Sequence, residues 1–397
     1  MRGEQMDEKM VTPVGLGFQT AAQVLIAHSG NGRSSDVRGK CSGVRAPAVA
    51  AARSVAPARG VHMMAGKSVP EKKAAGSAQE LAPAPATFFQ AINMAQNAVL
   101  KAISDGERLL EVEFPPLPSD QLESSSTGSY EVADANFRLA LDFCKRFVEE
   151  GYEDVVIAFP DAIEKDRFVE MLGETDRPAR GMRLGTISNA SKQNFFERIW
   201  LQQEVEPAVC SNDKMFVVLA ASAQELPEVE MLAKAASERD MPVILFNLKL
   251  DVARGDLGLP AFPSKDLHFR FLSKVRPAFY LRTRAYSKSI PQPPFLVNYS
   301  GALYRVYPGP WQVLLDTYAA GNASGEAGYV RVATQQERPP LGEVRDIMTK
   351  NVKVEGVDMG QFGVTSSPLM GLLRKGYKST TWWEEDWDKQ VSNNWRL

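Results

Sequence analysis

The chain is poor in the residues from which many catalytic and metal sites are built. Its 397 residues include three histidines and three cysteines. Beyond residue 66 the cysteines are Cys144 and Cys210, which form neither a disulfide framework nor a metal pair, so buried free thiols are expected. The one histidine there, His268, lies on a predicted amphipathic helix, where a structural role is favoured. This composition argues against a typical zinc site and against a histidine-based catalytic triad.

Standard nucleotide and protease motifs are also missing. The sequence contains no G-x-x-x-x-G-K-[ST], no G-x-G-x-x-G after a strand and no H-E-x-x-H. Residues 321–328 are rich in glycine but lack the lysine of a phosphate-binding loop, so a flexible loop is expected. We therefore predict no catalytic residue, no cofactor and no metal, and a protein that is not an enzyme.

Long apolar runs and a basic stripe are absent as well. No run approaches the roughly 18 apolar residues that span a bilayer, which predicts no transmembrane segment but leaves peripheral membrane contact open. The formal net charge is −2. A chain without a concentrated positive patch is not expected to have nucleic acid as its main partner.

The N-terminal region differs from the rest in composition. Residues 11–66 carry six basic residues and one acidic residue, and are rich in Ala, Ser, Gly and Val. This pattern is typical of an organelle transit peptide, with a disordered tail as the alternative, so residues 1–66 are predicted to be a transit peptide. Residues 67–85, rich in Ala, Pro, Lys and Glu, are predicted to be a linker.

The sequence contains short apolar runs that alternate regularly with predicted amphipathic helices. Runs of five to seven apolar residues that alternate with helices indicate parallel strands covered on both faces. We predict a three-layer open α/β sheet, mainly parallel, within a domain at 86–335. The predicted parallel strands are 109–114, 155–159, 182–187, 214–220 and 242–246, and one predicted helix is 192–201.

This alternation of apolar runs and helices ends after Asn247. Strands predicted at 277–284, 295–299 and 302–307 are expected to pair antiparallel at one edge of the sheet. The pattern at 311–318 fits either a helix or an extended segment. Residues 336–397 are predicted to be an irregular, acidic tail that either docks on its own domain or presents anchors to a partner. The tail's candidate anchors are Trp382, Trp383 and Trp387.

Polar side chains follow the predicted parallel strands. Because ligands bind beyond the carboxyl ends of such strands, these residues are candidates for a binding site. The competing interpretation, which we favour, is that Asp161, Ser188 and Ser222 cap the helices that follow. The candidates are Asp161, Ser188, Asn189, Ser222 and Asn247.

Three arginines lie on the predicted edge strands. Arg282 and Arg284 share one face of a strand. They either grip an anion or pair with acidic residues such as Glu326 and Glu337, and ion pairing is favoured. The candidates for partner contact in this region are Arg282, Arg284, Arg305, Tyr307 and Trp311.

Several short sequence motifs resemble those of a plastid and cyanobacterial family. They are Asp161 after a Phe-Pro strand end, the run at 242–250, Tyr280-Leu-Arg282, and the segment Arg305-Val-Tyr-Pro-Gly-Pro-Trp311. Over residues 86–335 the chain resembles the Low PSII Accumulation 3-like family, whose domain is also found appended to a plant chloroplast adenylate kinase.

The resemblance implies a chloroplast protein that is either stromal or loosely attached to thylakoids. It implies a role in photosystem II assembly, in which the core antenna subunit CP43 joins the complex, with a photosystem II subunit or another assembly factor as partner. The family contributes no catalytic residues. The alternative function is that of a nucleotide- or phosphometabolite-binding α/β domain, either an enzyme or a regulatory module.

Overall fold

The computed structural model describes residues 81–118, 121–122, 124–173, 178, 180–189, 206–317, 328–354, 380–385 and 392–397. The chain divides into two units, Met1–Met64 and Ala65–Leu397, and every described residue belongs to the second. The predicted transit peptide, most of the predicted linker and the helix predicted at 192–201 lie outside the described residues.

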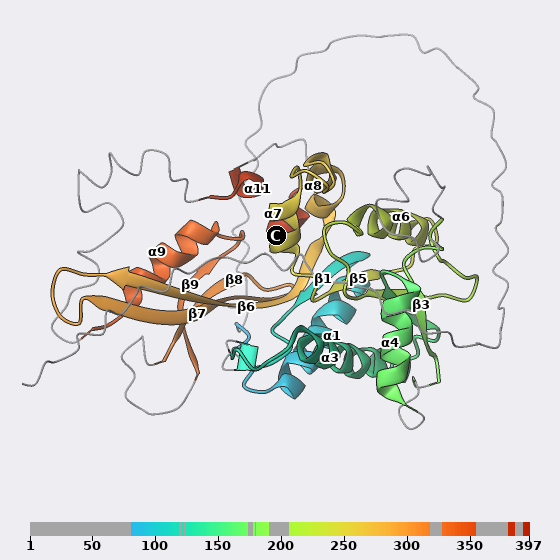
Figure 1. The fold of residues 1–397 in the computed structure, drawn as a ribbon, viewed down its shortest axis with the longest axis horizontal. Coiled ribbons are helices and arrows are strands. Elements are labelled where there is room, and N and C mark those ends of the chain that lie inside the picture. Colours follow the sequence, from blue (N-terminus) through green and yellow to red (C-terminus); the bar gives the residue numbers. More distant parts are fainter. Residues whose placement is uncertain are drawn as a thin grey trace, which may run out of the picture. The chain divides into compact units, whose positions relative to one another are not determined.

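One sheet of nine strands runs through the described residues, in the order β3-β2-β4-β5-β1-β6-β7-β8-β9 (Figure 1). Neighbours from β3 to β6 pair parallel, and β7 to β9 extend the sheet antiparallel. The predicted mainly parallel α/β sheet with antiparallel edge strands is confirmed. The strands are β1 (Leu109–Glu113), β2 (Val155–Phe159), β3 (Met182–Thr186), β4 (Met215–Val218), β5 (Val243–Phe246), β6 (Arg276–Ser289), β7 (Leu296–Val306), β8 (Trp311–Asp316) and β9 (Tyr329–Gln335).

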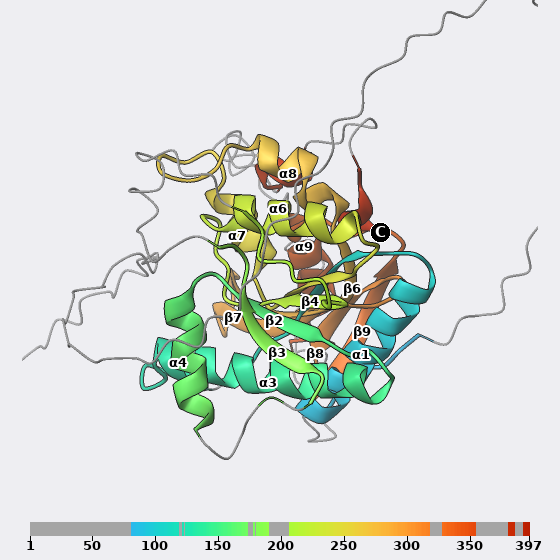
Figure 2. The ribbon, with the colours of Figure 1, turned by 90° about the vertical axis from the view of Figure 1, so that its right-hand side faces the viewer.

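Helices cover both faces of the parallel strands, which is why β2 and β4 are buried along their whole length. Figures 1 and 2 show α1, α3 and α4 on one face and α6, α7 and α8 on the other. The helical elements are α1 (Phe88–Ser104), α3 (Ser129–Glu149), α4 (Ala162–Leu172), α6 (Leu226–Ser237), α7 (Leu250–Asp256), α8 (Asp266–Arg270), η1 (Leu272–Lys274), α9 (Leu341–Asn351), α11 (Trp382–Glu385) and η3 (Asn394–Arg396).

The connections reverse direction between β2 and β4. From β2 the chain crosses through α4 to the outer strand β3, whereas from β4 it crosses through α6 towards β5 on the other side. In open parallel sheets, the carboxyl ends of the strands at such a reversal are the usual place for a ligand. The fold therefore directs attention to the carboxyl edge of the sheet.

Several local predictions were wrong. The strands expected at 295–299 and 302–307 form the single strand β7, because Gly301 marks a close approach and not a turn. A Cβ at Gly301 would stand 2.2 Å from the carbonyl oxygen of Leu314 on β8. Of the two alternatives for 311–318 the extended one is confirmed, since the segment begins with strand β8, whereas the part predicted as irregular from 336 contains α9. Helix α7 was not predicted at all.

Candidate functional site

The loop from β5 to α7 joins three elements at the carboxyl edge of the sheet. Asn247, at φ 52°, follows β5. Its Oδ1 accepts a hydrogen bond from the Phe114 N–H (2.8 Å), and its Nδ2 donates to Oδ1 of Asn136 on α3 (2.7 Å). Lys249 is also left-handed, at φ 51°, a conformation that is rare for lysine. The loop is therefore held in a strained shape by bonds to β1 and α3.

Glu113 at the end of β1 fixes the other half of this loop. Its Oε2 accepts a hydrogen bond from the Lys249 N–H (3.0 Å). The side chain is buried, and this burial raises its pKa to about 7, although the nearby charge of Arg282 acts in the opposite direction. A carboxyl group that titrates near neutrality thus lies beneath the loop.

Asp251, in the first turn of α7, is the centre of a buried group of charges. Its Oδ2 accepts a hydrogen bond from the Tyr280 hydroxyl (2.9 Å). Burial alone would raise its pKa, but the arginine charges outweigh burial and hold the pKa well below its usual range. Four arginines lie around the carboxylate: Arg338 at 2.6 Å, Arg254 and Arg284 each at 3.2 Å, and Arg282 at 3.5 Å.

Two glutamates of β1 complete what we call the ionic cluster: Glu111, Glu113, Asp251, Arg254, Arg282, Arg284 and Arg338. Burial raises the pKa of Glu111, against the charge of Arg254. In the described part of the chain, neither carboxylate oxygen of Glu111 has a hydrogen-bond partner, nor do Nε and Nη2 of Arg254. Charge and aromatic contact, more than a full set of hydrogen bonds, therefore hold these groups.

Aromatic rings pack against the guanidinium groups. Arg338 lies over the rings of Tyr280 (4.7 Å) and Trp311 (5.2 Å), and Arg254 lies over Trp395 (5.1 Å). Such contacts strengthen when water is excluded. The ionic cluster is consequently largely shielded from solvent, and within it Arg282 and Arg284 keep about a fifth of their side chains exposed.

The C-terminal segment contributes to this shielding. The Trp311 indole N–H donates to the carbonyl of Arg396 (2.7 Å), and the Arg338 backbone N–H donates to the same oxygen (2.9 Å). Trp383 and Trp395 are buried against the domain. Of the predicted anchors, Trp383 is thus docked intramolecularly, Trp382 is partly buried, and Trp387 lies outside the described residues.

A pocket of about 390 Å³ opens on the other side of the β5–α7 loop. Its walls include Phe137 and Phe168, and its polar groups include Asn136, Asn247 and Lys249. Apolar walls with a few converging polar groups are typical of small-molecule sites. The pocket can accommodate a ligand with an apolar body, and Lys249 would favour a negative charge on it.

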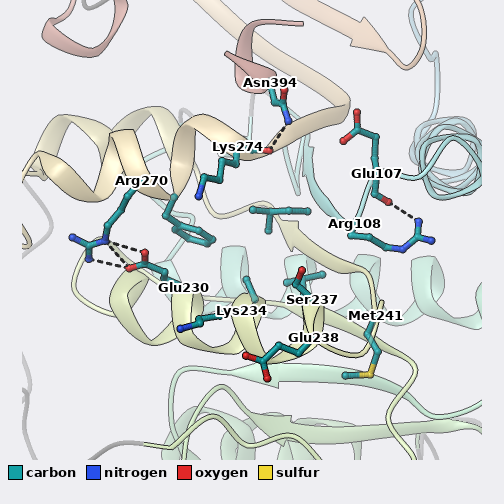
Figure 3. A pocket seen from close by; sticks show the side chains of 14 residues that line it. Glu107, Arg108, Glu230, Lys234, Ser237, Glu238, Met241, Arg270, Lys274 and Asn394 are labelled. Carbon is teal, nitrogen blue, oxygen red and sulfur yellow. Dashed lines mark hydrogen bonds and ion pairs between the residues drawn. The ribbon is translucent and has the colours of Figure 1, made fainter. Parts of the chain in front are cut away.

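A second pocket, of about 560 Å³, lies at the opposite edge, where β1 and β5 begin (Figure 3). Glu230 and Arg270 on its rim form an ion pair (2.9 Å), and Asn394 donates to the carbonyl of Lys274 (3.3 Å). The amino edge is not where such sheets bind ligands. The sequence did not predict this pocket.

The other predicted strand-end residues are engaged locally. Asp161 caps α4 by accepting bonds from the N–H groups of Ile163 (2.8 Å) and Glu164 (2.9 Å), which confirms its capping role. The capping role expected of Ser222 was wrong, because the N-cap of α6 is Glu225 and the Ser222 hydroxyl donates to the carboxylate of that residue. Only Asn247 among the five candidates lines the carboxyl-edge pocket.

Ser188 and Asn189 lie beyond β3. The hydroxyl of Ser188 donates to Glu228 of α6, so this serine bonds to a helix other than the one it was expected to cap. The Asn189 N–H donates to the carbonyl of Glu206 (2.9 Å). The strand-end residues therefore share one edge without converging on one site.

The predicted contact residues near β7 are mostly internal. Trp311 is fully buried, and Arg305 donates to the carbonyls of Pro277 (2.9 Å) and Gly309 (3.1 Å). Burial lowers the pKa of Arg305 to about 9. The Tyr307 hydroxyl donates to Asp105 (3.1 Å). These residues support the sheet, and their side chains are not arranged as a free surface.

The predicted ion pairing of Arg282 and Arg284 is confirmed, but with a partner that was not foreseen. Their partner is Asp251; Glu326 lies outside the described residues. His268 is buried against Trp382 and Trp395, and burial lowers its pKa to about 3, consistent with the structural role expected of it. Cys144 is buried as predicted, and Cys210 is partly buried.

The described residues contain neither a metal-binding cluster nor a membrane-spanning helix. No group of three or more His, Cys, Asp or Glu side chains within them is placed to hold a metal ion. None of their helices combines the length and apolar character needed to cross a membrane.

The comparisons with known proteins identify one family. No curated protein and no solved structure matches the chain. A domain of unknown function, DUF1995, matches residues 85–346, a span that runs from the start of α1 into α9 and contains the whole nine-stranded sheet. The chain therefore belongs to the DUF1995 family.

Proposed function

We propose that this protein is a non-enzymatic chloroplast assembly factor or scaffold that aids photosystem II biogenesis. Its step is the incorporation of CP43, and it acts in the stroma or at the thylakoid surface. Membership of the DUF1995 family and the resemblance to the Low PSII Accumulation 3-like family support this proposal. The finer assignment within the family is part of the proposal.

One structural observation carries a binding role. The Asp251 carboxylate and the arginines around it pair with one another inside the protein, whereas the hairpin of β6 and β7 extends past its neighbours (Figure 1). At its tip Phe295 and Leu296 are exposed by 58% and 51%. Exposed apolar groups on a projecting hairpin are suited to contact with another protein.

The hairpin tip offers a direct test. The full-length protein, tagged and cross-linked in intact chloroplasts, is expected to be recovered with CP43 or another assembly factor. Replacement of Phe295 and Leu296 by serine should weaken this recovery by about tenfold if the tip is part of the contact. Leu259→Ser is the matched control, since Leu259 is exposed to a similar extent (52%) on the loop between α7 and α8.

Function is measured separately from association. Pulse labelling should show slower entry of CP43 into photosystem II in a strain that lacks the protein, with rescue by the wild type. Recovery with soluble metabolic enzymes alone, together with normal CP43 entry in that strain, would refute the assembly role.

The carboxyl-edge pocket favours a second candidate, the binding of a small anionic metabolite such as a nucleotide. Lys249, Asn136 and Asn247 line this pocket and offer an ammonium group and two amides. A ligand at 100 times its Kd stabilises the folded state by about 2.7 kcal/mol. A thermal-shift screen with nucleotides should show stabilisation that Lys249→Ala reduces; no shift with any nucleotide at millimolar concentration rules this candidate out.

A further inference from the structure

The carboxyl-edge pocket is small, and most of its wall is apolar. Its volume of about 390 Å³ lies near the lower end of the roughly 300–1,000 Å³ that small-molecule sites span. Side chains of α3 and α4 and of the loops after β4 and β5 form it. The apolar lining residues are Val132, Ala133, Phe137, Phe168, Leu219 and Ala220. The pocket therefore suits a small ligand with an apolar body.

The backbone around this pocket is held in an uncommon conformation. Ala220, at φ 58°, follows β4, and Asn247 and Lys249, at φ 52° and 51°, follow β5. Left-handed residues other than glycine are uncommon, yet three of the seven in the described part of the chain line this one pocket. Such residues persist where the surrounding structure fixes them, and they concentrate at ligand sites. The strain therefore points to the same place as the cavity.

One backbone hydrogen bond fixes the orientation of both amides in the pocket. The Phe114 N–H can only donate, so the atom of Asn247 that it meets (2.8 Å) is Oδ1. The other amide atom of Asn247, Nδ2, then donates to Asn136, and the atom that it meets (2.7 Å) is Oδ1. Both carbonyl oxygens are thus engaged, and the amide group that Asn136 has left for a ligand is its NH₂ donor.

The other polar side chains of the pocket also donate. Lys249 is exposed and is the one charged side chain among the described residues that line the pocket. Within the described part of the chain, neither its ammonium group nor Nδ2 of Asn136 has a hydrogen-bond or ion-pair partner. Ser129 has a hydroxyl that donates or accepts. A ligand that satisfies these groups must bring acceptor atoms and a negative charge.

The pocket provides for one negative charge. Ser129 begins α3, so the positive end of this helix borders the pocket. Glu131 already places a carboxylate in that first turn, where it accepts a hydrogen bond from the Gly128 N–H (3.3 Å). Lys249 is left as the compensating charge. A phosphate monoester carries close to two negative charges at neutral pH, whereas a carboxylate carries one and matches the single lysine.

We propose that the carboxyl-edge pocket binds a small monocarboxylic acid with an apolar aliphatic or aromatic body. The carboxylate accepts hydrogen bonds from Nζ of Lys249 and Nδ2 of Asn136, and hydrogen bonds to an ionised group are the stronger kind. The body of the acid lies against the apolar wall. The inference rests on the second candidate function, because it names the ligand class of the same pocket, with a carboxylate in place of a nucleotide.

Calorimetric titration of the full chain tests the ligand class. The probes are octanoate and 4-phenylbutyrate. The controls are octanamide, a neutral isostere that presents a donor, octylamine, which reverses the charge, and AMP, which carries a phosphate monoester. At least one of the two acids should bind at least about tenfold more tightly than every control. Octanamide binding as tightly as octanoate, or no binding of either acid at millimolar concentration, overturns the proposal.

Two lysine variants locate the bound acid. Lys249→Met keeps an apolar stem and removes the charge, so it should weaken binding of the acid at least about tenfold. Lys274→Met is the matched control, because Lys274 is also exposed but lines the pocket at the amino edge (Figure 3). It should leave binding unchanged. Loss of binding in Lys274→Met but not in Lys249→Met places the acid in the other pocket and overturns the proposal.

An amide variant tests the assignment of the donors. Asn136→Asp keeps an oxygen for the bond from Asn247 but replaces the NH₂ group with a negatively charged oxygen. It should weaken octanoate binding at least about tenfold and strengthen octylamine binding. Thermal unfolding at the wild-type temperature shows that the variant folds. An unchanged preference for the acid in the folded variant contradicts the proposed contact.

The outcomes separate this inference from the proposed functions. If AMP binds in a manner that depends on Lys249 and neither acid binds, the monocarboxylate inference fails and the nucleotide candidate stands. If an acid binds in that manner and no nucleotide does, the nucleotide candidate fails and the inference stands. The assembly role is decided by CP43 entry alone, whichever ligand binds.

Discussion

One face of the sheet is stabilised in two different ways on the adjacent strands β5 and β1. Over β4 and β5, side chains such as Val218 and Leu245 pack against the apolar face of α6. On β1, Glu111 lies directly beside Leu245 in register, and here the same face carries the ionic cluster beneath α7 and the C-terminal segment. The difference shows that the side chains buried on a sheet face depend on the elements that cover it, not on position in the sheet alone. Charged residues can be buried on β1 because α7 and the C-terminal segment bring opposite charges and aromatic rings.

The largest expected effect tests whether the ionic cluster depends on the aromatic side chains that pack against it. Trp311→Ala should lower the free energy of unfolding by about 3–5 kcal/mol, because the indole is fully buried and bonds to Arg396. Urea unfolding measures this loss, and Trp311→Phe, which keeps an aromatic ring, should lose less. Normal stability combined with loss of a partner would instead make Trp311 an interface anchor.

The next effect concerns the central carboxylate. Asp251→Asn leaves four arginines around a neutral group and should cost about 3 kcal/mol at pH 7. Because the pKa of Asp251 is held below its usual value, its contribution is present above pH ~4 and is lost as pH falls through the folded-state pKa. The exposed Asp266→Asn serves as control and should cost less than about 1 kcal/mol. Equal losses for the two variants would show that the ionic cluster contributes no more than a surface ion pair.

Glu113 should have the opposite pH dependence. Its folded-state pKa is raised from 4.5 to about 7, so between these values only the folded state keeps the proton. Stability must then fall as pH rises through this window, by up to about 3 kcal/mol. Glu113→Gln should abolish the fall and be the more stable protein at pH 8. Unfolding measured from pH 4.5 to 8 tests this, and identical pH profiles contradict a buried neutral carboxyl.

The smallest effect belongs to the apolar half. Asp161→Ala removes the cap of α4 and should cost about 1 kcal/mol in thermal or urea unfolding. Asp161→Asn keeps an accepting oxygen and should cost less. If Asp161→Ala costs as much as Asp251→Asn, a carboxylate that caps one helix would contribute as much stability as one shared among several arginines. The contrast with the ionic cluster would then be lost.

The parallel strands and the helices between them could largely be predicted from the sequence, because each depends on a pattern of neighbouring residues. The apolar run at 155–159 coincides with β2, and Asp161 caps the helix that follows. The ionic cluster was not predictable in this way. Helix α7 has only seven residues, so its pattern is too short to stand out, and Asp251 meets Arg338 across 87 positions. A pair of arginines on one strand face was the only sign of it, and their carboxylate was sought in the wrong segment.

The placement of β1 has a consequence for how the protein is made. This strand emerges early during translation, yet it lies between β5 and β6, and Glu113 contacts Lys249 across 136 positions of the chain. Until those later strands have left the ribosome, both edges of β1 are unpaired and its two glutamates lack their arginines. Contacts so distant in sequence slow folding, and a nascent chain in this state is a natural client for chaperones.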